Sequence, residues 1–470
     1  MAPRQPEGPV HRGCHTGQGN VDRVRGWTIM QILAETHPEL LAARLQMAFT
    51  LGTHIILACL GVGLPVLLIL AEGLSLRGDR VWRELARRWS RAFAVLFAVG
   101  AVSGTVLSFE LGLLWPEFMG RWGSVIGLPF TLEGFAFFVE AIFAGIYLYG
   151  WDRLPARVHW LTAFPIAGAG FASAWFVVTA NAWMNSPTGF DIVDGQLVNI
   201  DPVAAMLNPA TGAQTTHMIL AAYMVTGFLL ASFYALQMLR GQRTPLVRRA
   251  LLASLALGCL ATPFQMVSGD WCAKVVARTQ PVKFAAMEAT FETTQRAPLH
   301  IGGIPDPKTG TVAFSLEIPG LLSFLASGDS RSTVVGLNDF PREDWPPVTI
   351  VHVAFQIMVG LGLFLLAVSI WTGVRAIRKT APDAGRGYLP LVFLSGPAAV
   401  IAMESGWVVT EVGRQPWIVQ GLMRTREAVT GAEGLWWILA FTILIYAVLL
   451  AGLWISLRLL AGLPGESGGA

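Results

Sequence analysis

The sequence is poor in charged residues. Asp, Glu, Lys and Arg make up only 13% of its 470 residues, whereas soluble domains carry roughly 25%. Hydrophobic residues make up 54%, with 17 Trp and 26 Phe among them. This shortage of charge excludes an ordinary soluble domain. Repeated apolar runs of about 20 residues indicate a polytopic membrane protein instead.

The chain also lacks a large net charge and a cysteine motif. The formal net charge of +3 is too small to argue for a nucleic-acid partner. The four cysteines, Cys14, Cys59, Cys259 and Cys272, have no metal-ligand spacing. Cys59 and Cys259 fall in apolar runs, so we expect them to be packing residues.

Residues 1–38 lack an apolar core. They are rich in Gly, Pro, Arg and His and contain no h-region of a signal peptide. We expect a disordered tail or a start codon assigned too far upstream, because Met30 begins a more ordinary sequence. His11, His15 and His37 are therefore weak ligand candidates.

Nine apolar segments predict an all-α bundle of nine transmembrane helices. The segments are 46–70, 91–113, 128–150, 160–182, 213–238, 249–268, 348–372, 389–410 and 436–458. Residues 39–268 would hold the first six helices, 269–347 a long hydrophilic loop, and 348–460 the last three. Residues 461–470 would form a C-terminal tail.

Arg and Lys are unevenly distributed between the connecting loops. They cluster in loops 71–92, 239–249 and 373–388, whereas 183–212 has none. Because cytoplasmic loops carry the excess of Arg and Lys, we expect the N-terminus and the long loop outside the cytoplasm. The C-terminus is expected inside.

The stretch 401–417 carries acids at membrane depth. Glu404, Trp407 and Glu411 share one helical face because they are spaced by three and then four residues. A buried carboxylate costs several kcal/mol unless it is paired or ligates something. Arg414 follows, with a planar fork suited to carboxylates or propionates. The alternative is an interfacial salt-bridge cluster with Trp anchors.

Three further residues are candidate iron ligands. His217 and Met358 lie on different predicted helices, and an imidazole and a thioether can supply both axial bonds of a low-spin haem. His54 can supply one axial nitrogen to an iron with an open position. The alternatives are packing for Met358 and interhelical hydrogen bonds for the histidines.

Acids on the second and third predicted helices complete this set. Glu110 ends the second helix, Glu133 starts the third, and Glu140 shares a face with Glu133. Two aligned acids favour a proton path, and the alternative is pairing with an Arg on a neighbouring helix. The ligands and acids fall at similar depth on six helices, which favours a buried redox site near the outer face.

In the long loop, Lys283 and Glu288 are five residues apart. Beside Phe284 and Met287, they could hold a quinol head group and take its proton. On the residues alone, a solvated helical face is the favoured interpretation.

These pieces together resemble subunit I of cytochrome bd-type quinol oxidases from about Leu41 onward. The most specific are Leu-Glu-Gly-Phe-Ala-Phe-Phe-Val-Glu at 132–140, Gly-Trp-Asp-Arg-Leu at 150–154, Ala-Asn-Ala-Trp-Met-Asn-Ser-Pro at 180–187 and Gly-Arg-Gln-Pro-Trp at 413–417. Their order along nine apolar segments leaves little room for chance.

The resemblance implies three haems. His217 and Met358 look like the axial pair of a low-spin haem b. His54 and Glu411 look like ligands of two high-spin haems, a haem b and either a haem d or a further haem b, with the assignment between them left open. Trp407 would pack on a haem edge.

The resemblance also assigns other roles. Arg414 would neutralise haem propionates, Glu133 would lie beside the oxygen site, and Glu140 would belong to the proton route. Lys283 and Glu288 match the quinol-oxidation motif of the outer loop, called the Q-loop.

The implied function is a respiratory terminal oxidase of the bacterial inner membrane. It would oxidise quinol at the outer face, reduce dioxygen to water and generate protonmotive force without pumping. The family works with a second multi-helix subunit, subunit II, and sometimes with a one-helix accessory subunit. The alternatives are a di-haem electron carrier and a haem-free proton-coupled transporter.

Two departures from the family pattern stand out. Many members have Arg where this chain has Gln356, so we expect a different potential of the low-spin haem. Residues 336–351 lack a long insertion, which resembles the short-loop group that includes the cyanide-insensitive oxidases. In that group haem d is not assured.

Overall fold

The computed structural model describes residues 39–381 and 387–462. Within these residues nine spans are long and apolar enough to cross a membrane. They are α2 (Leu40–Ser75), α3 (Arg80–Leu114), α4 (Pro116–Gly150), α5 with α6 (Ala156–Leu161 and Ala163–Asn185), α8 (Thr211–Leu239), α9 (Pro245–Thr279), α12 (Val348–Ile377), α13 (Tyr388–Val412) and α15 (Leu435–Gly462). The predicted fold class is confirmed. The tail expected at 1–38, with Cys14 and its three histidines, and residues 463–470 lie outside the described part.

Two helices continue past their predicted apolar runs. Helix α9 reaches Thr279, so the first part of the segment 269–347 is helical. An ion pair between Lys274 Nζ and Asp270 Oδ2 (2.6 Å), one turn apart, supports this polar extension. Helix α4 begins at Pro116, which places Glu133 near the middle of its helix rather than at the start.

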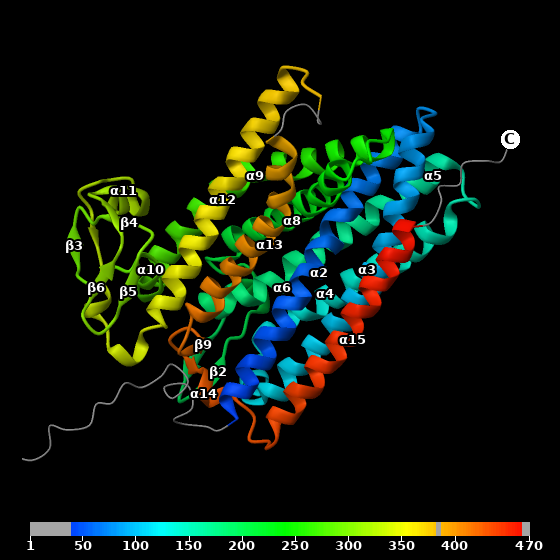
Figure 1. Ribbon diagram of the computed structural model, residues 1–470. Coiled ribbons are helices and arrows are strands. Elements are labelled where there is room, and N and C mark those ends of the chain that lie inside the picture. Colours follow the sequence, from blue (N-terminus) through cyan, green and yellow to red (C-terminus); the bar gives the residue numbers. More distant parts are fainter. Residues whose placement is uncertain (1–38, 382–386, 463–470) are drawn as a thin grey trace, which may run out of the picture.

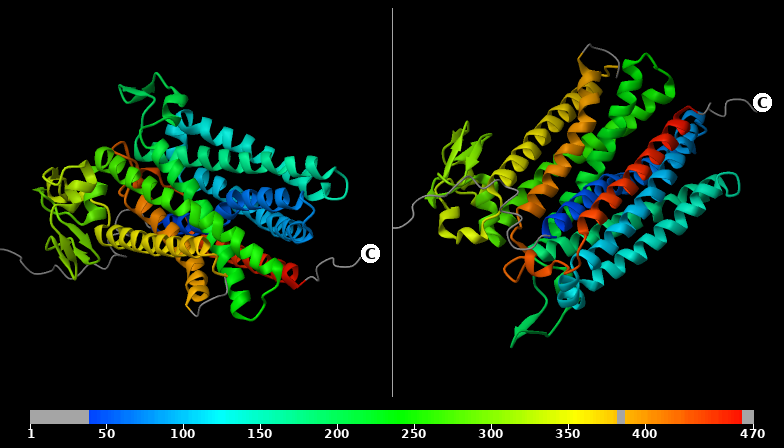
Figure 2. Two further views of the ribbon diagram at one scale, coloured as in Figure 1. Left: turned by 90° about the horizontal axis from the view of Figure 1, so that it is seen from above. Right: turned by 60° about the horizontal axis from the view of Figure 1, so that its bottom comes forward.

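The helices form two four-helix groups (Figures 1 and 2). In the first group α2 packs on α3 and α6, and α4 packs on the same two helices. In the second group α8 packs on α9 and α13, and α12 packs on the same two helices. Contacts of α2 and α6 with α8 join the groups, and α15 lies against α2 and α3.

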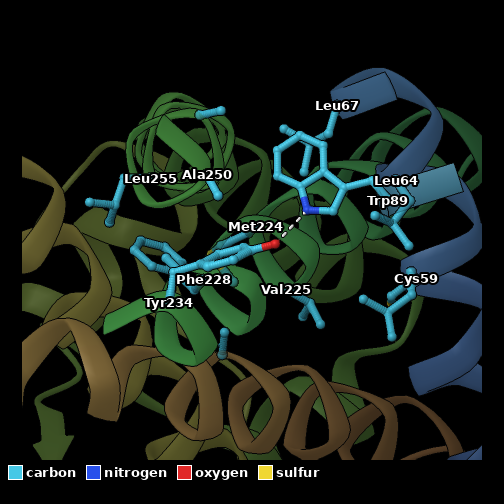
Figure 3. Close-up of a cluster of buried hydrophobic side chains, with 14 of the residues drawn as sticks. Cys59, Leu64, Leu67, Trp89, Met224, Val225, Phe228, Tyr234, Ala250 and Leu255 are labelled. Atoms are coloured by element: carbon cyan, nitrogen blue, oxygen red, sulfur yellow. Dashed lines mark hydrogen bonds between the residues drawn. The ribbon is translucent and has the colours of Figure 1, made fainter. Parts of the chain in front are cut away.

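A hydrophobic core fills the junction of the two groups (Figure 3). Trp89 of α3 donates its indole N–H to Tyr234 Oη of α8 at 2.8 Å, so this buried pair leaves neither polar group unsatisfied. Leu64 and Leu67 of α2 and Phe228 of α8 are fully buried around it. Apolar packing therefore holds the two helix groups together in this part of the molecule.

The long loop and the strand-bearing connections lie at the opposite end of the bundle from α5 (Figure 1). The long loop holds α10 (Pro281–Glu288), β3 (Thr294–Gln295), β4 (Leu299–Ile301), β5 (Ile304–Asp306), β6 (Thr311–Ala313), β7 (Leu316–Ile318), α11 (Leu321–Ser327), β8 (Thr333–Val334), η1 (Leu337–Asp339) and η2 (Arg342–Asp344). Its strands pair antiparallel as β3 with β8, β4 with β7 and β5 with β6. Shorter connections hold β1 (Asp191–Val193), β2 (Gln196–Val198), α7 (Pro202–Met206), β9 (Trp417–Val419), β10 (Met423–Arg424) and α14 (Thr425–Ala428).

Candidate functional site

His217 and Met358 lie on diagonally opposite helices of the second group. His217 belongs to α8 and Met358 to α12, and both helices pack on α9 and α13. Each side chain lies against a glycine of one of these two helices. An ideal Cβ on Gly269 would be 3.3 Å from His217 Cε1, and one on Gly406 would be 3.1 Å from Met358 Sδ. Bundle cores between facing helices are where cofactor sites are built.

The hydrogen bonds of His217 leave one ring nitrogen able to bind a metal. Its Nδ1 lies 3.0 Å from Ser268 Oγ, whose own hydroxyl donates to the Gln265 carbonyl (3.0 Å). Ser268 has one proton to give, so it accepts from Nδ1–H. Nε2 is then the unprotonated nitrogen, as iron ligation requires. It accepts a hydrogen bond from Gln265 Nε2 at 3.1 Å, and this amide would have to turn away for Nε2 to bind iron.

His54 repeats this arrangement in the first group. Its Nδ1 lies 2.9 Å from Ser103 Oγ, and Ser103 donates to the Gly100 carbonyl at 2.9 Å. An ideal Cβ on Gly104 would be 3.0 Å from His54 Cε1. The same reasoning leaves Nε2 of His54 with a free lone pair.

A cavity of about 440 Å³ adjoins the turn of α2 that carries His54. Its lining comes from α2, α3, α13 and α15 and includes Gly52, Leu57, Leu96, Glu404 and Leu453. Glu404 Oε1 is buried there without a hydrogen-bond partner in the described chain. An apolar cavity with one convergent polar group is typical of a ligand site.

Glu411 of α13 is held by a side chain of α6 and by Arg414. Arg414 Nη2 donates to Glu411 Oε2 at 2.6 Å, and Asn181 Nδ2 donates to Glu411 Oε1. Arg414 is only 3% exposed, and its Nε and Nη1 have no partner in the part of the chain described. Buried guanidinium donors without acceptors fit an anionic group such as a haem propionate. The donors around Glu411 and the two imidazoles thus fit haem binding.

Glu110 forms a local contact between two helices. Gln46 Nε2 donates to its Oε1 at 2.9 Å, and Thr50 Oγ1 donates to its Oε2 at 2.5 Å. Both donors belong to α2, the helix that also carries His54. The carboxylate therefore fixes α3 against α2 beside the candidate ligand.

Glu133 and Glu140 face α6 from the same side of α4. Ser173 Oγ donates to Glu133 Oε1 at 3.2 Å, and Glu140 packs against Gly170. The partner of Glu133 is thus a serine hydroxyl rather than the arginine of the alternative interpretation. A spacing of seven residues separates the two acids by roughly 10 Å along the helix.

Lys283 and Glu288 are both buried on α10, at 4% exposure each, so the interpretation as a solvated face was wrong. Lys283 Nζ donates to Asn185 Oδ1 (2.9 Å), to the Thr410 carbonyl (3.0 Å) and to Gln280 Oε1 (3.4 Å). Burial, with Arg414 nearby, lowers the pKa of Lys283 to about 7. Burial raises the pKa of Glu288 to about 8. Glu288 Oε2 has no hydrogen-bond partner among the described residues.

Sequence analysis missed the amide and hydroxyl partners of these residues. Asn181 and Asn185 lie in the Ala-Asn-Ala-Trp-Met-Asn stretch and contact Glu411 and Lys283, but nothing in their spacing identifies those partners. Gln356 has a contact that its position did not predict. Its side chain donates to the His300 carbonyl (2.9 Å) and accepts from Gly302 N–H (3.0 Å), which ties the loop to α12.

Comparison with known proteins agrees with this geometry. A family model described as cytochrome bd terminal oxidase subunit I matches residues 42–462. A solved structure of bd oxidase from Geobacillus thermodenitrificans aligns with a TM-score of 0.84 and 40% identity, covering 90% of this chain and 98% of that chain.

Two curated relatives come from Bacillus subtilis (strain 168). One, provisionally named cytochrome bd menaquinol oxidase subunit I, is 38% identical over 417 residues, which are 87% of this chain and 94% of that protein. The other, named cytochrome bd ubiquinol oxidase subunit 1, is 30% identical over 404 residues, 83% of this chain and 86% of that protein. The chain belongs to the cytochrome bd terminal oxidase subunit I family.

Proposed function

We propose that this chain is the haem-bearing subunit of a quinol:dioxygen oxidoreductase, a respiratory terminal oxidase that reduces dioxygen to water. The observation that carries the proposal is the diagonal placement of His217 and Met358 in one four-helix group, with glycines against both side chains. His54 in the neighbouring group repeats the same serine-bound imidazole.

Four residues of the chain would hold the haems. His217 and Met358 would bind the low-spin haem b, and His54 and Glu411 would bind the two high-spin haems, a haem b and a haem d or a further haem b. These groups supply the electron transfer and the oxygen chemistry. Arg414 would neutralise propionates through its two unpartnered nitrogens. Trp407, partly buried beside the core, would pack on a haem edge.

Quinol would dock against α10. The unpartnered carboxylate oxygen of Glu288 is the group on this helix able to accept a proton from a quinol hydroxyl. Because burial raises its pKa to about 8, Glu288 can take a proton as the pH approaches 8 and release it afterwards. We infer that this release occurs at the outer face, since the loop lies on the side predicted to be extracytoplasmic.

Protons for the reduction of dioxygen would come from the opposite face. Glu140 and Glu133 follow one another on the α4 face that packs on α6, and Glu110 fixes α3 beside His54. Uptake from the cytoplasm and release outside would build protonmotive force without a pumping step. The route therefore depends on the two acids of α4 in sequence.

The exposed apolar surface of α4 is consistent with assembly in a membrane. Phe135, Phe138, Ile142 and Tyr149 are all exposed by 60% or more. Lipid or another apolar helix must cover such a face. We place the chain in a bacterial inner membrane with subunit II, and a one-helix accessory subunit is a further candidate partner.

The test is a reduced-minus-oxidised optical spectrum of membranes that contain the chain and its partner, repeated under carbon monoxide. We expect a low-spin haem b signal and a separate high-spin haem that binds carbon monoxide. His54→Ala should abolish oxygen consumption and retain the low-spin signal. A low-spin haem without any carbon monoxide response would indicate an electron carrier, and absence of all haem would contradict the proposal.

A further inference from the structure

A directed chain of hydrogen bonds connects the loop helix α10 to Glu411. It starts at Lys283 Nζ, which donates to Asn185 Oδ1 at 2.9 Å. Asn185 Nδ2 donates to Asn181 Oδ1 at 3.1 Å and to its carbonyl at 2.9 Å. Asn181 Nδ2 donates to Glu411 Oε1. Residues of the loop, α6 and α13 thus share one hydrogen-bond network. Asn181 and Glu411 within it are more than 200 positions apart in sequence.

The direction of this chain is fixed at the lysine. An ammonium group has three donors and no acceptor, so Asn185 must turn its oxygen toward Lys283. Its NH₂ group then faces Asn181, which accepts and turns its own NH₂ toward the carboxylate. Reversing either amide would oppose two donors or two acceptors. Hydrogen bonds aligned in this way polarise one another in a buried site.

The lysine has no proton left over for a quinol. Asn185, Thr410 and Gln280 accept from its three N–H groups, the last at the longest distance, 3.4 Å. Its stem also packs against Gly413, where an ideal Cβ would be 3.0 Å from Lys283 Cε. In this arrangement Lys283 holds α10 against the ends of α6 and α13.

We propose that Asn185 is a positioning residue that couples the quinol-side helix α10 to the iron ligand Glu411, with Lys283 acting through it. This inference rests on the proposed function for the roles of α10 and Glu411. Asn185 touches neither haem nor quinol in the proposal. It holds Asn181 in the orientation that donates to Glu411, and it holds Lys283 in the orientation that fixes α10.

Two substitutions test separately the two hydrogen-bond links of Asn185, one to Lys283 and one to Asn181. Asn185→Asp keeps an acceptor for Lys283 but has no NH₂ group for Asn181, so Asn181 must turn to donate to Asp and present its oxygen to Glu411. Asn185→Leu breaks both links at similar volume. Ser186→Ala is the matched control, because Ser186 Oγ is buried without a partner in the described chain.

The measurements use the assembled two-subunit oxidase. In Asn185→Asp we expect a changed optical signature of the high-spin haem bound by Glu411, an unchanged low-spin signal, and a KM for ubiquinol-1 within about twofold of the parent. In Asn185→Leu we expect the same spectral change, a KM raised about tenfold, and trypsin cleavage of the loop accelerated by a similar factor, as loss of a charge-assisted hydrogen bond implies. Ser186→Ala should match the parent.

Unchanged high-spin spectra, KM and cleavage in Asn185→Leu would overturn the inference. If Asn185→Leu does not assemble, the spectrum and KM of Asn185→Asp decide it. The cleavage rate needs neither haem nor quinol. If the parent protein lacks oxidase activity while Asn185→Leu still accelerates cleavage of the loop, the proposed function fails and the link from Asn185 to α10 stands.

Discussion

At the scale of single residues, the serine hydroxyls decide what the histidines can do. Ser268 and Ser103 each donate their hydroxyl proton to a backbone carbonyl of their own helix, so each accepts a hydrogen bond from a histidine Nδ1–H. This fixes the tautomer of both imidazoles and their ring orientation before any metal arrives. Helices α8 and α2 thereby present unprotonated Nε2 atoms from two different four-helix groups, and that of His217 also accepts from Gln265 Nε2 at 3.1 Å.

Removal of one of these serines should therefore weaken the binding of one haem. Ser268→Ala leaves Nδ1 of His217 without its acceptor, and loss of such an outer partner typically costs about 10- to 100-fold in metal affinity. We expect a reduced low-spin haem content in the purified protein, measured by the haem b absorbance per protein. Ser254→Ala is the control, because Ser254 Oγ is buried on the same helix without a partner in the described chain. Equal haem contents in the two variants would contradict the assigned tautomer.

The raised pKa of Glu288 leads to a prediction for the pH dependence of quinol oxidation. Its pKa is raised by burial to about 8, so it is largely protonated at pH 6 and becomes a proton acceptor only as the pH rises toward 8. We expect kcat with a soluble quinol to rise over this range. Glu288→Gln should lower kcat by about 100-fold or more and remove the rise, since it removes a general base.

The control for this prediction is Glu292→Gln, an exposed carboxylate four residues further along. It should leave the pH profile as in the parent. If Glu288→Gln keeps the rise, another group controls the rate.

At the scale of elements, close helix contacts lie both within and between the four-helix groups. An ideal Cβ on Gly227 of α8 would lie 2.3 Å from the Gly258 nitrogen of α9, within the second group. An ideal Cβ on Gly63 of α2 would lie 2.2 Å from Thr226 Oγ1 of α8, between the groups. Real Cβ atoms cannot come so close, so Gly227 permits a backbone contact and Gly63 makes room for the Thr226 side chain. Thr226 also donates to the Cys59 carbonyl at 2.8 Å across this contact.

Gly227→Ala should separate α8 from α9. The nearest atoms are backbone atoms that cannot move aside, and overpacking of this kind costs about 1–3 kcal/mol or more. We expect a lower apparent melting temperature of the detergent-solubilised protein. Gly168→Ala on α6 is the control, because nothing lies within 4 Å of its ideal Cβ. Equal melting temperatures would show that α8 and α9 have room to adjust.

The elements differ in how well the sequence predicts them. Each transmembrane helix has an apolar run long enough to be recognised, and all nine predicted segments are present in the described chain. The loop strands are only two or three residues long, too short for a period of two to be recognised. The polar extension of α9 was missed because hydropathy reports membrane depth and not helix length.

Candidate site residues could be proposed from the sequence where a charged group or a possible ligand atom lies at membrane depth, as for Glu411, His54 and His217. Their hydrogen-bond partners were not predictable. Asn181 and Glu411 lie far apart in sequence, so only the folded arrangement, in which α6 and α13 both pack on α8, brings them together. Lys283 and Glu288 were interpreted as a solvated face because the spacing of two charged residues does not reveal that the helix carrying them, α10, is buried.

At the scale of the whole molecule, the residues proposed for quinol oxidation lie at one end of the bundle. The loop, with its helix α10, lies there, whereas α5 lies at the other end (Figure 1). Proton balance depends on which face of the membrane this end occupies. Release of quinol protons outside contributes to protonmotive force, and release inside would cancel it.

The distribution of Arg and Lys predicts that the loop faces outward. Alkaline phosphatase inserted at Gly328, an exposed position after α11, should therefore be active in whole cells. The same enzyme inserted at Gly241, exposed between α8 and α9, should be inactive, and a fluorescent protein should give the reverse pattern. Phosphatase activity at Gly241 but not at Gly328 would place quinol oxidation on the cytoplasmic side. The proposed uptake of cytoplasmic protons through Glu140 and Glu133 would then be untenable, because the face opposite the loop would be the outer one.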